Sequence, residues 1–328
     1  MAQLFTSAAP HVHSGDTVQK NMLLVILALL PAFAVSIIAF GWSALITAAI
    51  CIAACVLTEW CISKYMLGQQ PSITDLSAVL TGLLLAMNLP SNLPWWMAVI
   101  GCIVAIGIGK MVFGGIGQNL FNPALVGRVF LLISFPAAMT TWPVAKGFAT
   151  SYLDAETGAT PLYYLKHITK TGDVSFVDQL PAIKDAFLGM MGGSLGEVCA
   201  LALIIGGIFL ICTRVISWHI PVSILATVAL LSWIATPEGM GAHEFIAYQL
   251  CSGGLMLGAI FMATDYVTSP MTAWAKIIYG VAIGVIVMVI RLWGSYPEGM
   301  SFAILIMNAV VPLLDRIAPK RFGEVAKK

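Results

Sequence analysis

The chain has 328 residues, of which 59% are hydrophobic and only 9% are charged, and its mean hydropathy is +0.95. About a quarter of the residues of a soluble globular domain are charged, so this composition excludes that class. The formal charge of +1 indicates no acidic or basic partner, and no basic, aromatic-rich stretch favours the binding of nucleic acid.

Apolar runs close to twenty residues long recur along the chain and predict an all-α polytopic membrane protein with about ten transmembrane helices. A β-barrel would instead show alternating segments of about ten residues. The predicted spans cover approximately residues 21–40, 43–65, 75–89, 95–110, 122–135, 195–212, 220–235, 245–262, 272–292 and 300–314.

These spans divide the chain into five regions. They are an N-terminal segment (1–20), a first membrane half (21–135), a polar interval (136–195), a second membrane half (196–316) and a basic tail (317–328). Most Lys and Arg residues of the short connections fall on the side of the two termini. The positive-inside rule therefore predicts cytoplasmic termini and an extracytoplasmic 136–195 loop.

The two halves also resemble each other. The third span, with L-T-G-L-L-L-A-M-N-L-P, is similar to the eighth, with L-M-L-G-A-I-F-M-A-T-D. Five spans in each half give the copies opposite orientations, which predicts an inverted repeat. Helices rich in Gly, Leu and Ala also resemble one another without a repeat, and that explanation stays open.

The polar interval contains the segment D-A-E-T-G-A-T, from Asp154 to Thr160. Thr157, Gly158 and Ala159 precede Thr160, and the small residues favour a turn that leaves its hydroxyl exposed. Thr160 is therefore a candidate for a covalent modification, in which it would tether a redox cofactor and would not turn over substrate. The alternative is an ordinary polar surface turn.

A second candidate site lies where the fifth span begins. The segment Gly114–Arg128 is rich in glycine but lacks G-K-[ST], so it is not a nucleotide-binding loop. Asn119, Asn122 and Pro123 predict the start of a short helix whose first amides face a polar cavity. Arg128 is expected to balance an anionic flavin ring there or to pair with a lipid phosphate.

A third candidate follows the eighth span. Asp265 lies at a predicted helix end, and carboxylates at the border of a membrane are often functional. Thr268 and Ser269 would form a polar loop beside it, with hydroxyls suited to a ring system or a phosphate. Glu59, inside the second span, is expected to make an interhelical hydrogen bond. The seven cysteines form no C-x-x-C pair, and no metal site is predicted.

With these motifs together, the chain resembles the NqrB/RnfD family of membrane flavoprotein subunits. T-G-A-T with Asp154 upstream is similar to the family's flavin-transferase recognition sequence, although Ala155 replaces a frequent Gly. D-L-S-A-V-L-T-G-L-L-L-A-M-N-L-P, F-N-P-A-L-V-G-R and A-T-D-Y-V-T-S-P-M-T also match the family in order. The short segment before the first span favours the Rnf D-subunit branch over the B subunit of the Na⁺-pumping NADH:quinone reductase.

The resemblance implies an electron-transfer subunit with FMN bound covalently to Thr160 through a phosphoester. It implies a bacterial cytoplasmic (inner) membrane complex that couples ferredoxin:NAD electron transfer to Na⁺ or H⁺ translocation, with no activity of this chain alone. The expected partners are the G flavoprotein, the membrane subunits A and E, subunits B and C, and a flavin transferase. Analogy with the quinone reductase adds noncovalent riboflavin near the cytoplasmic half. A urea-channel-like solute transporter and a structural scaffold are the alternatives.

Overall fold

A computed structural model describes residues 16–68, 73–145, 148, 157–171, 174–189, 191–296 and 298–316. The helices of the first half are α1 (Val18–Phe40), α2 (Trp42–Cys61, continued by Ile62–Met66), α3 (Ser77–Met87), α4 (Trp95–Ile103, continued by Val104–Ile108) and α5 (Pro123–Ser134). Those of the second half are α9 (Ala200–Cys212), α10 (His219–Ile234), α11 (Ala242–Cys251), α12 (Leu255–Leu257, continued by Gly258–Met262), α13 (Ala273–Trp293) and α14 (Met300–Leu314).

The polar interval between the halves has structure of its own. It contains α6 (Pro136–Met139), β1 (Trp142–Pro143), β2 (Thr157–Gly158), α7 (Pro161–Thr171), a 3₁₀ segment (Val174–Gln179) and α8 (Ile183–Leu188). The two short strands pair antiparallel, with Trp142 opposite Gly158 and Pro143 opposite Thr157.

The all-α polytopic fold predicted from the sequence is confirmed, and each predicted span contains a helix in the expected order. The lengths differ from the prediction. Among the described residues, four helices are long and apolar enough to cross a membrane. Helix α11 with α12 makes a fifth if this pair, bent by 62°, is one span. The other five apolar helices are shorter; α3, with 11 residues, extends only about 16 Å, against about 30 Å of hydrocarbon.

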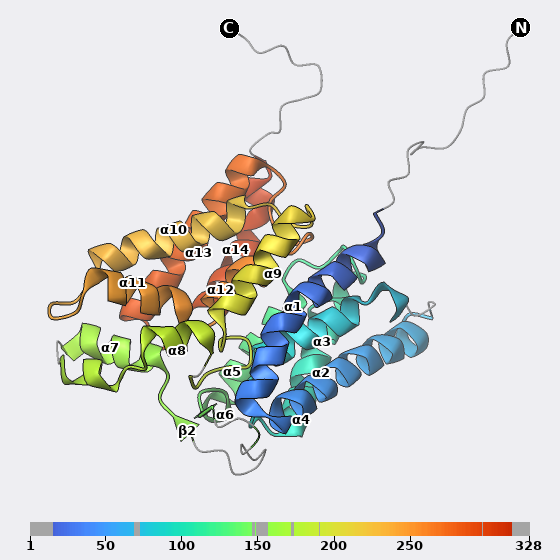
Figure 1. Ribbon diagram of the computed structural model, residues 1–328. Coiled ribbons are helices and arrows are strands. Elements are labelled where there is room, and N and C mark those ends of the chain that lie inside the picture. The colour runs from blue at the N-terminus through green and yellow to red at the C-terminus, as the bar shows by residue number, and fades with distance from the viewer. Residues whose placement is uncertain are drawn as a thin grey trace, which may run out of the picture.

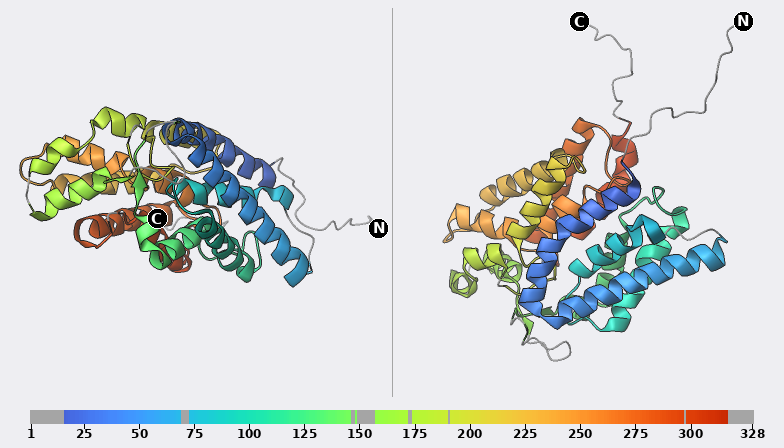
Figure 2. Two further views of the ribbon diagram at one scale, coloured as in Figure 1. Left: turned by 90° about the horizontal axis from the view of Figure 1, so that it is seen from below. Right: turned by 45° about the vertical axis from the view of Figure 1, so that its right-hand side comes forward.

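The two halves use the same packing pattern. In the first half α2 packs against α3 and α4, and in the second half α10 packs against α11 and α13. The halves meet through corresponding helices, because α1 packs along α9 and α5 contacts α14. Figures 1 and 2 show this as a blue group, α1 to α4, beside an orange and red group, α10 to α14. The pattern agrees with the repeat that the sequence suggests.

Glycines allow two of these helix contacts. A Cβ on Gly206 of α9 would collide with the carbonyl oxygen of Ala28 on α1. A Cβ on Gly82 of α3 would lie 2.7 Å from the Cα of Ile52 on α2. Small residues bring helix backbones close together in this way when both helices are in lipid.

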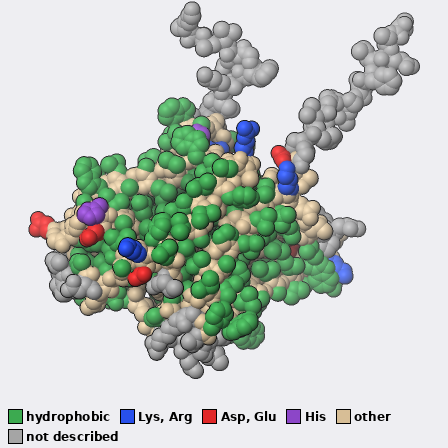
Figure 3. Space-filling view, in the orientation of Figure 1, with side chains coloured by type: hydrophobic (Ala, Val, Ile, Leu, Met, Phe, Trp, Pro, Cys, Tyr) green, Lys and Arg blue, Asp and Glu red, His purple; other side chains and the backbone are tan. Residues whose placement is uncertain are grey.

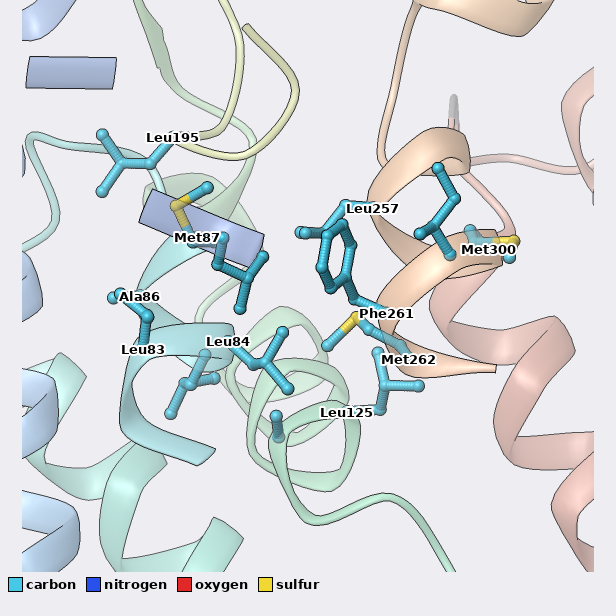
Figure 4. Close-up of a cluster of buried hydrophobic side chains, with 14 of the residues drawn as sticks. Leu83, Leu84, Ala86, Met87, Leu125, Leu195, Leu257, Phe261, Met262 and Met300 are labelled. Carbon is cyan, nitrogen blue, oxygen red and sulfur yellow. The ribbon is translucent and has the colours of Figure 1, made fainter. Parts of the chain in front are cut away.

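The centre of the molecule, between the halves, is apolar. Leu84 and Met87 of α3 face Phe261 and Met262, with Leu257 and Leu125 beside them (Figure 4). The outer surface is apolar as well, and charged side chains are few on the face drawn in Figure 3. Both observations suit a protein whose helices contact lipid on the outside and one another on the inside.

The described ends of the chain lie at one end of the molecule, and β2 lies at the opposite end (Figures 1 and 2). The start of α1 and the end of α14 therefore point away from the segment that contains Thr160. This arrangement agrees with the predicted placement of the termini and of the 136–195 interval on opposite sides.

Candidate functional site

The segment that ends at Thr160 joins a two-stranded ribbon to a helix. Gly158 in β2 packs against β1 so closely that a Cβ would lie 3.0 Å from Cγ2 of Val144, which explains a glycine there. Thr157 and Ala159 are exposed, and Thr160 directly precedes Pro161, the first residue of α7. Asp154, the upstream residue of the motif, lies outside the described residues.

Thr160 is more buried than the sequence predicts, with 7% of its surface exposed. Its carbonyl oxygen accepts a hydrogen bond from the Tyr163 amide (2.9 Å), which begins α7, whereas its hydroxyl bonds to none of the described residues. An exposed turn was predicted from the small residues before it. The structure instead places Thr160 among the buried residues.

Helix α7 is fixed to the membrane part of the molecule at two points. Near its start, Leu162 packs on Gly253, where a Cβ would lie 2.6 Å from Cδ1 of Leu162. Further along, Nζ of Lys166 donates to the carbonyl oxygen of Tyr296 (2.8 Å). Thr160 is therefore held beside the break that separates α11 from α12.

A pocket of about 90 Å³ lies at the other end of the molecule. It is lined by the start of α1, the starts of α3 and α5, the end of α9 and residues 261–267. Asn119 and Asp265, from separate candidate sites of the sequence analysis, both line it. Asn122 caps α5 by accepting from the Ala124 amide (3.1 Å), and Pro123 is the first helical residue, so the predicted helix start is confirmed.

Asp265, Thr268 and Ser269 form one turn, as the sequence suggests. The Thr268 hydroxyl donates to Oδ2 of Asp265 (3.1 Å), and the Ser269 amide donates to its carbonyl oxygen (3.1 Å). Burial raises the pKa of Asp265, and this hydrogen bond from Thr268 opposes that rise. Thr268 and Ser269 do not line the pocket, so Asp265 is the member of this group that does.

Arg128 does not join Asn119 at the pocket. It points from the middle of α5 into a buried cluster, where Nη1 donates to Oδ1 of Asn88 (2.8 Å) and Nη2 donates to Oε2 of Glu298. A second carboxylate, Glu197, lies 3.9 Å from the same Nη2. The described charged partners of Arg128 are therefore protein carboxylates, where the sequence predicts a flavin ring or a lipid phosphate.

The buried cluster also forms hydrogen bonds to the backbone at the break between α11 and α12. Oε1 of Glu298 accepts from the Gly254 amide (3.1 Å) at the start of α12. Arg291, from the last turn of α13, donates to the carbonyl oxygens of Gln249 (2.6 Å) and Ser252 (3.0 Å) at the end of α11. Carbonyls freed at a helix break must be satisfied inside a membrane protein, and Arg291 does this.

Glu197, Glu298 and Arg291 were not predicted as members of a site. A signal existed: S-G-G at 252–254 interrupts the eighth span, and a buried arginine in the fifth span requires a carboxylate. Nothing in the sequence selects which of the distant glutamates provides it. The expectation for Glu59 is confirmed, because its Oε2 accepts from Nζ of Lys110 (2.6 Å).

The candidate residues thus fall into two groups, at opposite ends of the short helices α3 and α12. Thr157 to Thr160 lie near the cluster that contains Arg128, and Asn119 and Asp265 lie at the pocket. Helix α3 runs from Ser77 at the pocket to Asn88 at the cluster, about 16 Å. Helix α12 with its continuation connects Gly254 to the pocket in the same way over about 12 Å.

The chain is similar over nearly its whole length to known proteins. The family described as NQR2, RnfD, RnfE matches residues 5–323. The D subunit of the Na⁺-translocating ferredoxin:NAD⁺ oxidoreductase complex of Acetobacterium woodii is 45% identical, covering 99% of this chain and 96% of that protein. The D subunit of the ion-translocating oxidoreductase complex of Stutzerimonas stutzeri is 42% identical (95% and 94%). The D subunit of the proton-translocating ferredoxin:NAD⁺ oxidoreductase complex of Clostridium ljungdahlii is 43% identical (98% and 96%).

Proposed function

We propose a function from the premise that this chain belongs to the NQR2, RnfD, RnfE family. It is the D subunit of an ion-translocating ferredoxin:NAD⁺ oxidoreductase complex, in which it transfers electrons and has no activity alone. Similarity over nearly the whole length to relatives with that name supports the assignment. Two of these relatives are named for different ions, so the choice between Na⁺ and H⁺ does not follow from the family.

We propose further that Thr160 carries FMN through a phosphoester. The observation that supports this is the position of Thr160 at the first turn of α7, an eleven-residue helix, with a hydroxyl that bonds to none of the described residues. The first turn of a helix favours a phosphate, because its amides and its dipole are positive there. The flavin, once bound, supplies one-electron and two-electron chemistry.

The residues around Thr160 hold the attachment point in place. Leu162 anchors the start of α7 on Gly253, and Lys166 anchors its middle on Tyr296. The low exposure of Thr160 means that the flavin transferase acts while this segment is displaced from its packed position. We infer that FMN is attached before the segment of residues 157–171 docks on the second half.

Intact-protein mass spectrometry tests the attachment in protein co-expressed with its flavin transferase. The chain is expected to gain the mass of one FMN moiety, and the denatured band is expected to fluoresce under ultraviolet light. Thr160→Ala is expected to lose both signals, whereas Thr171→Ala, at the exposed end of the same helix, keeps them. An added mass that survives Thr160→Ala would contradict the assignment.

We also propose that the pocket lined by Asn119 and Asp265 is where noncovalent riboflavin binds. Its polar groups suit the edge of a flavin ring, but its 90 Å³ is below the 300 Å³ or so of typical ligand pockets, so it must widen first. Acid extraction of the Thr160→Ala protein should release riboflavin, and Asn119→Ala should lower its amount. No flavin in that extract would contradict the proposal.

The topology completes the proposal. We propose that both termini are cytoplasmic, that Thr160 is extracytoplasmic, and that the membrane is the bacterial cytoplasmic membrane. The separation of the described chain ends from β2 supports their placement on opposite sides of the membrane, and the positive-inside rule supports the cytoplasmic side for the ends. The partners are then the G flavoprotein on the Thr160 side, the membrane subunits A and E, and subunits B and C. A maleimide that does not cross membranes should label a cysteine placed at residue 171 in intact cells.

A further inference from the structure

Beneath the Thr160 segment, two carboxyl groups share one guanidinium group inside the protein. Glu298 pairs with Nη2 of Arg128, and Oε1 of Glu197 lies 3.9 Å from the same nitrogen. The side chain of Glu197 is 3% exposed and that of Glu298 is 15% exposed. Two carboxylates so close to one cation inside a protein do not both ionise readily, because like charges repel strongly where the dielectric is low.

The two carboxyl groups have different hydrogen bonds. Glu298 accepts from Arg128 and from the Gly254 amide (3.1 Å), so its ionised form is well satisfied. Glu197 has one long contact to a donor, between Oε2 and the Ser194 amide (3.5 Å), and its Oε1 accepts from no described donor. Its carboxyl group also lies against that of Glu298, and a hydrogen bond between two carboxyl groups needs a proton on one of them. A buried, unsatisfied carboxylate is costly, and a proton on that oxygen removes the cost.

We propose that Glu197 is a buried proton-exchange site, with Arg128 and Glu298 as its fixed ion pair. The carboxylate takes up one proton from a hydronium ion, so that an O–H bond of the hydronium ion breaks and one forms on Glu197. The reverse step returns the proton to a water molecule. No electron moves in this step. The charged groups that face Glu197 are Arg128 from α5, Glu298 from the loop before α14, and Arg291 from α13 at the far side of Glu298.

The acid–base properties of the pair agree with this assignment. Burial disfavours the ionised form of Glu197, and the nearby charge of Glu298 disfavours it further. Burial alone would raise the pKa of Glu298 as well, but Arg128 and its hydrogen bonds outweigh it and hold this pKa at about 2. The proton therefore resides on Glu197 while Glu298 stays ionised.

The location of Glu197 would couple its proton exchange to charge near Thr160. Gly253, on which Leu162 rests, lies between Arg291 and Glu298, so the start of α7 sits directly on the cluster. A negative charge that arrives near Thr160 raises the proton affinity of Glu197, and its departure lowers that affinity. This coupling rests on the proposed FMN at Thr160; the proton exchange of Glu197 does not.

Infrared difference spectroscopy of the purified complex, stepped between two pH values, tests the proposal. A protonated buried carboxyl gives a C=O stretching band that shifts in D₂O. That band is expected to disappear in Glu197→Gln and to persist in Glu238→Gln, a matched change at a glutamate outside the cluster. A wild-type spectrum without such a band, or a band unchanged in Glu197→Gln, would overturn the proposal.

A second variant keeps the test valid if Glu197→Gln fails to fold. Glu298→Gln removes the competing negative charge, so Arg128 can pair with Glu197 alone. The C=O band of Glu197 should then titrate at a pH at least about one unit lower than in the wild type. A titration that does not move would overturn the shared ion pair.

The Thr160→Ala complex separates this proposal from the proposed function. Its pH-dependent band should persist, whereas the band change that accompanies reduction of the flavin in the wild type should be lost. A wild-type band that responds to pH but not to reduction would overturn the coupling alone. An unmodified Thr160 with an intact pH-dependent band would overturn the flavin assignment and support the exchange site.

Discussion

Replacing Arg128 by Gln tests the buried cluster at its centre. The change leaves Glu298 inside the protein without its cation and removes the donor to Asn88. At a separation of about 4 Å and an effective dielectric constant of about 20, one ion pair is worth about 4 kcal/mol, and Arg128 forms such a pair with Glu298. Breaking a buried ion pair by removing one partner typically costs about 3 to 5 kcal/mol, so we expect Arg128→Gln to lower the unfolding free energy by that amount.

The unfolding free energy is measured by titrating the purified chain in mild detergent with SDS and following its far-ultraviolet circular dichroism. Arg128→Gln combined with Glu298→Gln should regain most of the loss, because no unpaired charge remains. Arg214→Gln, at an exposed arginine, should change stability by less than about 0.5 kcal/mol. A single variant as stable as the wild type, or a double variant no better than the single, would refute the reasoning.

Two further predictions concern helix packing and acid stability. Gly206→Val should separate α1 from α9, because its side chain collides with the Ala28 carbonyl; we expect a loss of several kcal/mol in the same SDS titration. Gly107→Ala, where a Cβ meets only an ordinary contact at 3.6 Å, serves as its control and should stay near the wild type. The pKa of Glu298 is held at about 2, below its ordinary value of 4.5, so its ionised form stabilises the fold. This contribution to stability is complete above about pH 5 and should be lost as the pH falls towards about 2. The Glu298→Gln variant should lose less stability over the same pH range, and identical acid profiles of the variant and the wild type would contradict this prediction.

The sequence was sufficient for the order of the helices and for the local features. Apolar runs located all ten segments, and Asn122 with Pro123 marked the start of α5. The end of α3 was predicted to within two residues, but its contact with the other half was not, because the carbonyl of Met87 accepts a hydrogen bond from the distant Gly196 amide. That hydrogen bond belongs to tertiary structure and leaves no local pattern.

The candidate site was predictable only in part. Asn119 and Asp265 line the same pocket. Both are polar residues near helix ends, and the sequence shows that much. The partner of Arg128 was not predictable, because Glu298 lies 170 residues away and resembles any loop glutamate. The contact of Leu162, two residues beyond Thr160, with Gly253 joins segments that the sequence does not link.

The short helices at the centre have an electrical consequence. Charged and polar side chains reach inward from both faces, and about 12 to 16 Å of apolar contacts separate Asn88 and Gly254 from the opposite pocket. An energised bilayer drops its voltage over about 30 Å of hydrocarbon. Across this thinner layer the same voltage gives an electric field about twice as strong. The electrical work for each ångström that a monovalent cation moves there is therefore about twice as large, and the work for crossing the whole membrane is about 2.3 kcal/mol per 100 mV.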